Sequence, residues 1–133
     1  MVVSRASILE ANFRTQVSKH KATPRRVDLD HPVRAGTTLS ARQCLEIFIA
    51  QCESRICDFL SRELKSRGES FYTIASSGHE GNAAVGHGIA LDDISFLHYR
   101  SGAYFLARAN RSPGTEGAFD VLLGMVAARD EPI

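Results

Sequence analysis

The stretch that decides the fold of this chain is FYTIASSGHEGNAAVGHGIALDDISFLHYRSGAYFLAR, residues 71–108. Near its start, Ser77 and Glu80 have the S-x-x-E spacing of a capping box, which predicts a helix over Gly78–Leu91. An interior glycine costs a helix about 1 kcal/mol relative to alanine. The several glycines of this segment therefore indicate that another backbone or a ligand packs closely against the helix.

The second half of the stretch predicts a strand followed by a helix. Residues Ile94–Tyr99 are rich in strand formers, and an apolar helix is expected over Ala103–Ala109. Arg100 stands between them, where the unpaired N–H groups and the dipole of the helix favour an anion. Its guanidinium matches phosphate oxygens, and Tyr99 could add a hydroxyl. The pattern fits a phosphate site, and it also fits a surface arginine beside a half-buried tyrosine.

Taken in order, the motifs of residues Leu39–Ile133 resemble the α-subunit region of thiamin-diphosphate-dependent 2-oxo acid dehydrogenases. The amino-acid sequence of these motifs is most similar to that of bacterial forms in which the α and β halves are fused. The family pattern has a Gly-Arg-rich helix end, an aromatic loop, a Gly-[His/Gln/Glu]-Glu turn that opens a small-residue helix, and a Tyr-Arg pair further on. This chain supplies the four elements as Arg67-Gly68, Phe71-Tyr72, Gly78-His79-Glu80 and Tyr99-Arg100.

The resemblance implies an α/β fold, of which this chain is an amino-terminal, mostly helical fragment with one or two short strands. It implies an enzyme that decarboxylates a 2-oxo acid with thiamin diphosphate and Mg²⁺ and passes the acyl group to lipoamide. Tyr99 and Arg100 are expected to bind the diphosphate. Tyr72, or less favourably Phe71, is expected to line the acyl pocket. His79 is expected to contact the substrate carboxylate or to orient its turn.

The implied partners are a β half or β subunit, a lipoyl acyltransferase core and the 2-oxo acid, within an oligomer. The Gly-Asp-Gly motif that holds the metal in this family is absent, so the metal ligands are expected outside this chain. No catalytic residue is assigned, and the chain alone is expected to be inactive. The alternative is a non-catalytic helical module that binds a partner through the apolar stripe described next.

A long helix is predicted from Ser40 to Arg67. Ser40 and Gln43 have the spacing of a capping box, and Gly68 suits the left-handed position after the helix end. Asp58 and Arg62 are spaced for an i, i+4 ion pair. Large apolar residues recur at helical intervals, which predicts a stripe that faces the core. The members of this apolar stripe are Leu45, Phe48, Ile49, Cys52, Ile56, Phe59, Leu60 and Leu64.

Residues 1–38 are interpreted as an extended arm in which Ala6–Ser18 could form a helix, and residues 39–133 as an incomplete thiamin-diphosphate-binding domain. A last helix is predicted to end near Ala128. The formal charge of +1 provides no electrostatic argument for nucleic acid or a membrane surface. No apolar run reaches the roughly 18 residues of a membrane span, and no secretory segment follows Met1. A cytoplasmic location is therefore predicted.

The three cysteines are predicted to be reduced, buried thiols on the long helix. Their spacing does not fit the C-x₂₋₄-C pairs of a zinc site. They are Cys44, Cys52 and Cys57.

Overall fold

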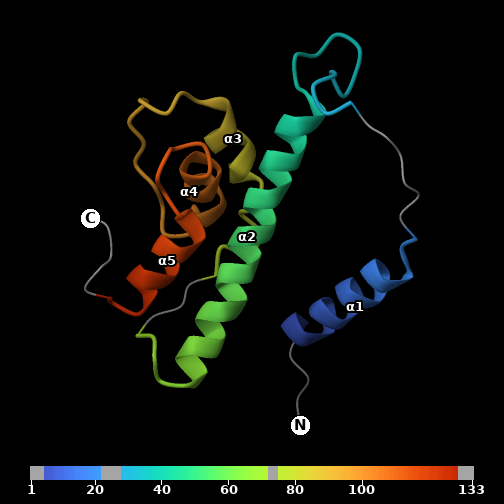
Figure 1. Cartoon of the computed structure of the whole chain (residues 1–133). Helices are drawn as coiled ribbons and strands as arrows, with labels where there is room; N and C mark the ends of the chain where they lie inside the picture. Colours follow the sequence, from blue (N-terminus) through green and yellow to red (C-terminus); the bar gives the residue numbers. More distant parts are fainter. Residues whose placement is uncertain (1–4, 22–27, 72–74, 129–133) are drawn as a thin grey trace.

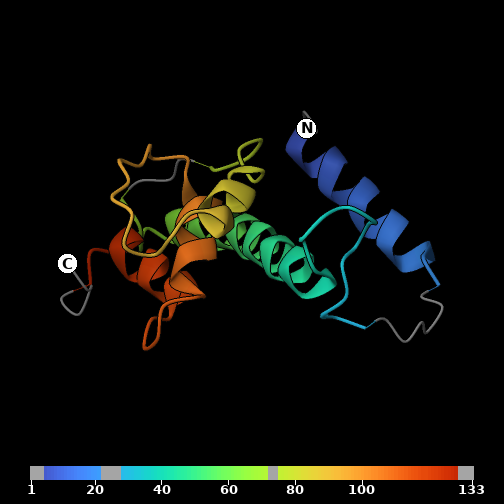
Figure 2. The same ribbon diagram turned by 90° about the horizontal axis from the view of Figure 1, so that it is seen from above.

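The computed structural model describes residues 5–21, 28–71 and 75–128. These ranges contain five helices: α1 Arg5–Lys19, α2 Ala41–Ser66, α3 Asn82–Gly88, α4 Gly102–Ala109 and α5 Gly117–Met125. Helices α3, α4 and α5 lie on one side of the long α2, and α1 lies apart on its other side without contacting the other helices (Figures 1 and 2). The prediction of a mostly helical chain is confirmed.

Local signals explain where α2 begins and ends. The Ser40 side chain accepts a hydrogen bond from the Gln43 N–H at 3.2 Å, and the Gln43 side chain accepts one from the Ser40 N–H at 2.9 Å. The Arg42 N–H donates to the Leu29 carbonyl at 2.7 Å, so the preceding loop satisfies another free donor of the first turn. Gly68 follows with φ 74°. The predicted helix and both of its ends are confirmed.

The face of α2 that the other helices cover is not the apolar stripe. The buried residues of α2 are mostly small: Ala50, Ser54, Cys57, Asp58 and Ser61. The apolar stripe lies on the opposite face by helical spacing. Its exposed members are Leu45, Phe48, Ile49, Ile56, Phe59 and Leu60. The prediction of a core-facing stripe is wrong, because α4 and α5 pack against the side of α2 that carries small residues.

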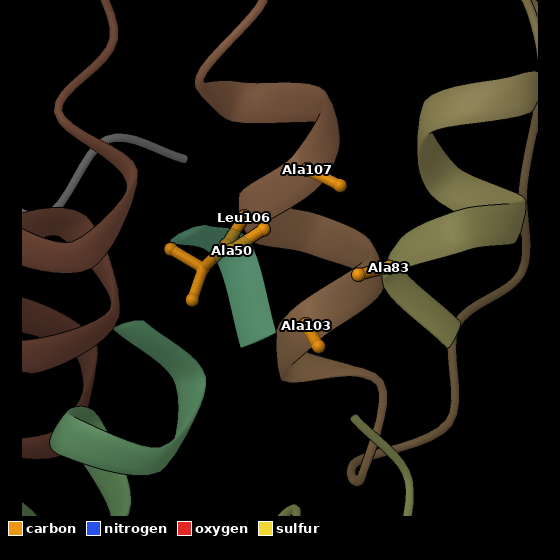
Figure 3. Packing of buried hydrophobic residues seen from close by; sticks show 5 residues of the cluster. All are labelled: Ala50, Ala83, Ala103, Leu106 and Ala107. Carbon is orange, nitrogen blue, oxygen red and sulfur yellow. The ribbon is translucent and has the colours of Figure 1, made fainter. Parts of the chain in front are cut away.

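The buried centre of the molecule consists mainly of alanine. Figure 3 shows its members, which come from α2, α3 and α4: Ala50, Ala83, Ala103, Leu106 and Ala107. Such small side chains allow the helix axes to come close together. Gly86 of α3 lies directly against the backbone of Tyr104 in α4, so the predicted close approach of another backbone is confirmed at this glycine.

The predicted strand over Ile94–Tyr99 is not formed, and none of the residues in the described ranges belongs to a named strand. A strand requires a neighbouring strand to bond its N–H and C=O groups, and the described ranges supply none here. Residues 94–98 instead form an open loop in which the Phe96 side chain is 100% exposed. Strand-forming composition is thus insufficient without a partner strand.

The helix predicted over Gly78–Leu91 is also shorter than expected, because α3 begins only at Asn82. The helices predicted after Arg100 and before Ala128 are confirmed as α4 and α5, and the helix in the amino-terminal arm is confirmed as α1. Among the described helices, none is both long and apolar enough to cross a membrane.

Candidate functional site

A turn over residues 75–80 lies between the middle of α2 and the start of α4. Two charged side chains of α2 hold it. The Asp58 Oδ1 accepts a hydrogen bond from the Ser76 N–H at 2.9 Å. The Arg55 Nη1 bonds the Ser77 hydroxyl at 2.7 Å. These contacts place the turn firmly against α2, although 18 and 22 residues of chain separate the partners.

Glu80 completes this attachment. Its Oε1 lies 2.6 Å from Nη2 of Arg55, and its Oε2 accepts a hydrogen bond from the Gly78 N–H at 2.8 Å. Ser77 and Glu80 therefore bind Arg55 and the turn itself instead of forming the predicted capping box. This use of both side chains explains why α3 starts later than the capping-box spacing predicted.

The same turn contacts the start of α4. The Arg100 Nη1 donates to the Ala75 carbonyl at 2.8 Å. A β-carbon on Gly102 would lie 2.7 Å from Ser76 Oγ and 3.1 Å from Ser54 Oγ, so a larger residue here would force these serine side chains to shift. We call residues 75–80 together with residues 98–102 the α4 junction. It joins the two motifs that the sequence analysis selected, Gly78-His79-Glu80 and Tyr99-Arg100.

Tyr99 and its neighbours form a stack at the outer side of the α4 junction. The rings of His98 and Tyr99 have centroids 3.8 Å apart, and the Arg100 Cζ lies 5.5 Å from the Tyr99 centroid. Tyr99 is 62% exposed. In a strand the side chains of residues 98 and 99 would have pointed to opposite faces. Their stacking is possible because the strand is not formed.

The first turn of α4 offers backbone donors next to Arg100. The N–H of Phe105 is the first to bond within the helix, to the Ser101 carbonyl at 3.0 Å. The Ser101 side chain makes no capping hydrogen bond. A helix start without a side-chain cap, next to a guanidinium, favours an anion.

The other residues that the sequence analysis assigned to the site make fewer contacts with the α4 junction or lie outside the described residues. His79 is exposed within the turn, three residues after Ser76. Phe71 is 84% exposed, and Tyr72 lies outside the described residues. The α4 junction thus gathers Tyr99, Arg100 and the turn that carries His79.

Asp58 is the most buried charged group of this region, with 4% of its surface exposed. Burial raises the pKa of its carboxyl group, against the opposite effects of the Ser76 N–H and of Arg55. Its Oδ2 lies 3.8 Å from Nη1 of Arg55 and has no hydrogen-bond partner among the described residues. The predicted Asp58–Arg62 ion pair is not formed, because the Asp58 carboxylate binds the turn and the Arg62 guanidinium lies over the Phe59 ring.

The sequence analysis missed Arg55 and Asp58 as functional candidates. The available signal was a pair of opposite charges at i, i+3 on a helix face otherwise made of small residues. It also missed Arg108, whose guanidinium donates to the carbonyls of Ala90, Leu91 and Asp93 at 2.9, 2.6 and 2.9 Å. Arg108 thereby fixes the start of the loop that leads to the α4 junction.

No group of three or more His, Cys, Asp or Glu side chains within residues 5–21, 28–71 and 75–128 is arranged to hold a metal ion. Comparisons of the chain with protein-family models, with curated proteins and with solved structures found no match.

Proposed function

We propose that this chain supplies the diphosphate-binding part of a thiamin-diphosphate-dependent 2-oxo acid dehydrogenase. The observation that carries the proposal is the α4 junction, where Arg100, at the uncapped start of α4, bonds the Ala75 carbonyl of the turn that continues into Gly78-His79-Glu80. A guanidinium beside a helix start suits a diphosphate.

In this function, Arg100 and the first N–H groups of α4 bind the diphosphate oxygens, and Tyr99 adds its hydroxyl. His79 donates a hydrogen bond to the carboxylate of the 2-oxo acid. Thiamin diphosphate, when bound, supplies the electron sink for decarboxylation. The Mg²⁺ ligands and the rest of an α/β fold lie outside this chain. The partners are a β half or β subunit and a lipoyl acyltransferase core, within a cytoplasmic oligomer. Tyr72 would line the acyl pocket.

The test is a titration of the ¹⁵N-labelled chain with thiamin diphosphate and Mg²⁺, followed by NMR. Binding should shift the amide signals of Tyr99, Arg100 and the first turn of α4. Loss of a charge-assisted contact worth about 1.5–3 kcal/mol should weaken binding about 10- to 150-fold in Arg100→Ala. Tyr99→Phe should weaken it less, about 2- to 10-fold, since the donor that is lost carries no charge of its own.

Arg62→Ala serves as the control, because this arginine is exposed on α2 and contacts Phe59 instead of the α4 junction. Thiamin without phosphate is the control ligand, and it should not shift the same amides. An Arg100→Ala variant with unchanged affinity for thiamin diphosphate would remove the proposal.

A second candidate is the non-catalytic interaction module, and the exposure of the apolar stripe on α2 favours it. Six large side chains lie open along one face of the helix, with exposed fractions from 38% at Phe59 to 59% at Phe48. An amphipathic partner helix is the ligand that fits such a face. Light scattering after gel filtration tests it. Self-association that Phe48→Ser and Ile56→Ser abolish together would favour this function, and a monodisperse monomer at every concentration would count against self-association.

A further inference from the structure

We infer that Arg55 is a positioning residue: it fixes His79 relative to Arg100 by holding the two side chains that flank Gly78-His79. The inference rests on the proposed function, in which His79 contacts the 2-oxo acid and Arg100 the diphosphate. It assigns a role in substrate binding to a side chain of α2 that precedes the turn by more than twenty residues.

The contacts of Arg55 enclose the His79 segment. Nη1 bonds the Ser77 hydroxyl at 2.7 Å, and Nη2 lies 2.6 Å from Oε1 of Glu80. Ser77 precedes the Gly78-His79 pair and Glu80 follows it. A single planar guanidinium therefore fixes both ends of the segment, which a flexible point charge could not do.

Arg55 is itself held in place on α2. Its Cζ lies 5.9 Å from the ring centroid of Phe59, one turn further along the helix. Its Nη1 also lies 3.8 Å from Oδ2 of Asp58, the carboxylate that accepts the Ser76 N–H through its other oxygen. Helix α2 thus holds three residues of the turn, Ser76, Ser77 and Glu80, through two adjacent charged side chains.

The segment needs this external constraint because its own backbone allows other positions. Gly78 has φ 87°, in a region where glycine turns freely. The remaining contacts of the segment are local, such as the His79 N–H to the Ser76 carbonyl at 2.8 Å. Without Arg55, His79 could move while Ser76 stays fixed by Asp58.

Arg100 does not depend on Arg55 in the same way. Its guanidinium bonds the Ala75 carbonyl, which lies before the segment that Arg55 holds. Gly102 packs on Ser76 and Ser54, which also lie outside that segment. Loss of Arg55 should therefore displace the carboxylate-binding side chain and leave the diphosphate-binding residues in place.

The experiment uses the whole chain with ¹³C-labelled histidine in saturating thiamin diphosphate and Mg²⁺, titrated with pyruvate and with 3-methyl-2-oxobutanoate. In the unmodified chain the 2-oxo acid should shift the His79 ring signals. Arg55→Ala should weaken this response about tenfold or more, because a small displacement of a binding group has a large effect on binding. The affinity for thiamin diphosphate should stay within about twofold of that of the unmodified chain. Arg55→Lys should recover part of the response, because it keeps a positive charge beside Glu80.

Arg62→Ala is the matched control, because Arg62 also lies 5.9 Å from the Phe59 ring but does not contact the turn. If Arg55→Ala unfolds the chain, Glu80→Gln removes the ion pair while α2 stays intact, and the same selective loss is expected. The inference is overturned if these variants weaken thiamin diphosphate and 2-oxo acid equally, or if Arg55→Ala leaves the response of His79 unchanged. Failure of the proposed function is separate, because it appears as unchanged cofactor affinity in Arg100→Ala or as a His79 that does not respond to a 2-oxo acid in the unmodified chain.

Discussion

A β-carbon on Gly86 would lie 2.5 Å from the carbonyl oxygen of Tyr104. Real β-carbons do not approach a backbone so closely, so α3 and α4 can pack in this way only with glycine at position 86. The same backbone contact holds α4 in place a few residues after the α4 junction. The geometry of the candidate site therefore depends on a glycine that carries no functional group.

Gly86→Ala should destabilise the chain by about 1–3 kcal/mol, since the helices must separate to admit the methyl group. Gly88→Ala is the matched control in the same helix, because a β-carbon there would have nothing within 4 Å. That variant should change the free energy of unfolding by no more than about 1 kcal/mol. Urea unfolding followed by circular dichroism measures both. Equal effects of the two substitutions would contradict the close contact.

The buried carboxyl group of Asp58 should make stability depend on pH. Its pKa is raised above 3.8 by burial, so the folded chain binds this proton more tightly than the unfolded chain does. The resulting stabilisation is present below the ordinary pKa and is lost as pH rises through the raised value. Asp58→Asn removes this dependence, and its amide oxygen can still accept the Ser76 N–H.

We therefore expect Asp58→Asn to gain stability relative to the unmodified chain as pH rises from about 4 to about 7. Urea unfolding of both proteins at several pH values gives the difference in their free energies of unfolding. The contributions of the other acidic residues are the same in both proteins and cancel in this difference. Glu63→Gln, an exposed change on the same helix, should show a much smaller trend. If the stability of Asp58→Asn relative to the unmodified chain stays constant or falls as pH rises, burial does not raise the pKa of Asp58.

The three thiols should differ in reactivity. Cys57 is 4% exposed, and burial, with smaller effects of Glu53 and Asp58, raises the pKa of its thiol to about 11. At pH 8 only about one molecule in a thousand carries the reactive thiolate. Cys44 and Cys52 are partly exposed. Iodoacetamide followed by mass spectrometry should label these two first and Cys57 only on unfolding; early labelling of Cys57 would refute its burial.

Ser40→Ala should destabilise α2 by about 0.5–2 kcal/mol, because the capping acceptor of the Gln43 N–H is lost. Ser66→Ala, at the exposed other end of the helix, should cost less than about 0.5 kcal/mol. Thermal unfolding of the two variants provides the comparison. A Ser66 variant as destabilised as the Ser40 variant would argue against a specific cap.

Features set by neighbouring residues could be predicted from the sequence. The capping box at the start of α2 consists of Ser40 and Gln43, and Gly68 follows the end of the helix, so spacing was sufficient to predict both ends. Periodicity also revealed an apolar stripe, but it could not reveal which face of α2 the other helices would cover. The strand at 94–99 failed for a related reason, since β-structure needs hydrogen bonds from a distant segment.

The candidate site was predicted only in part. Tyr99, Arg100 and the turn with His79 were selected from their motifs. The structure bonds Arg100 to the Ala75 carbonyl of that turn, and the role of these residues as a site stays a prediction. Arg55 was not selected, because its partners Ser77 and Glu80 are remote in sequence and arginine on a helix surface is ordinary. Only the folded chain shows which of several arginines on α2 contacts the turn.

The alanine centre of this molecule changes how it should respond to random mutation. In most proteins a core residue is more easily replaced by a smaller one, and the damage is a cavity. At Ala50, Ala83, Ala103 and Ala107 nearly every replacement is larger, so the damage is steric crowding that forces helices apart. Within this cluster, Leu106 is the member whose truncation would leave a cavity. In a library of variants, most substitutions at these positions that prevent folding should therefore be to larger side chains. Compensating substitutions should replace a residue on the facing helix with a smaller one.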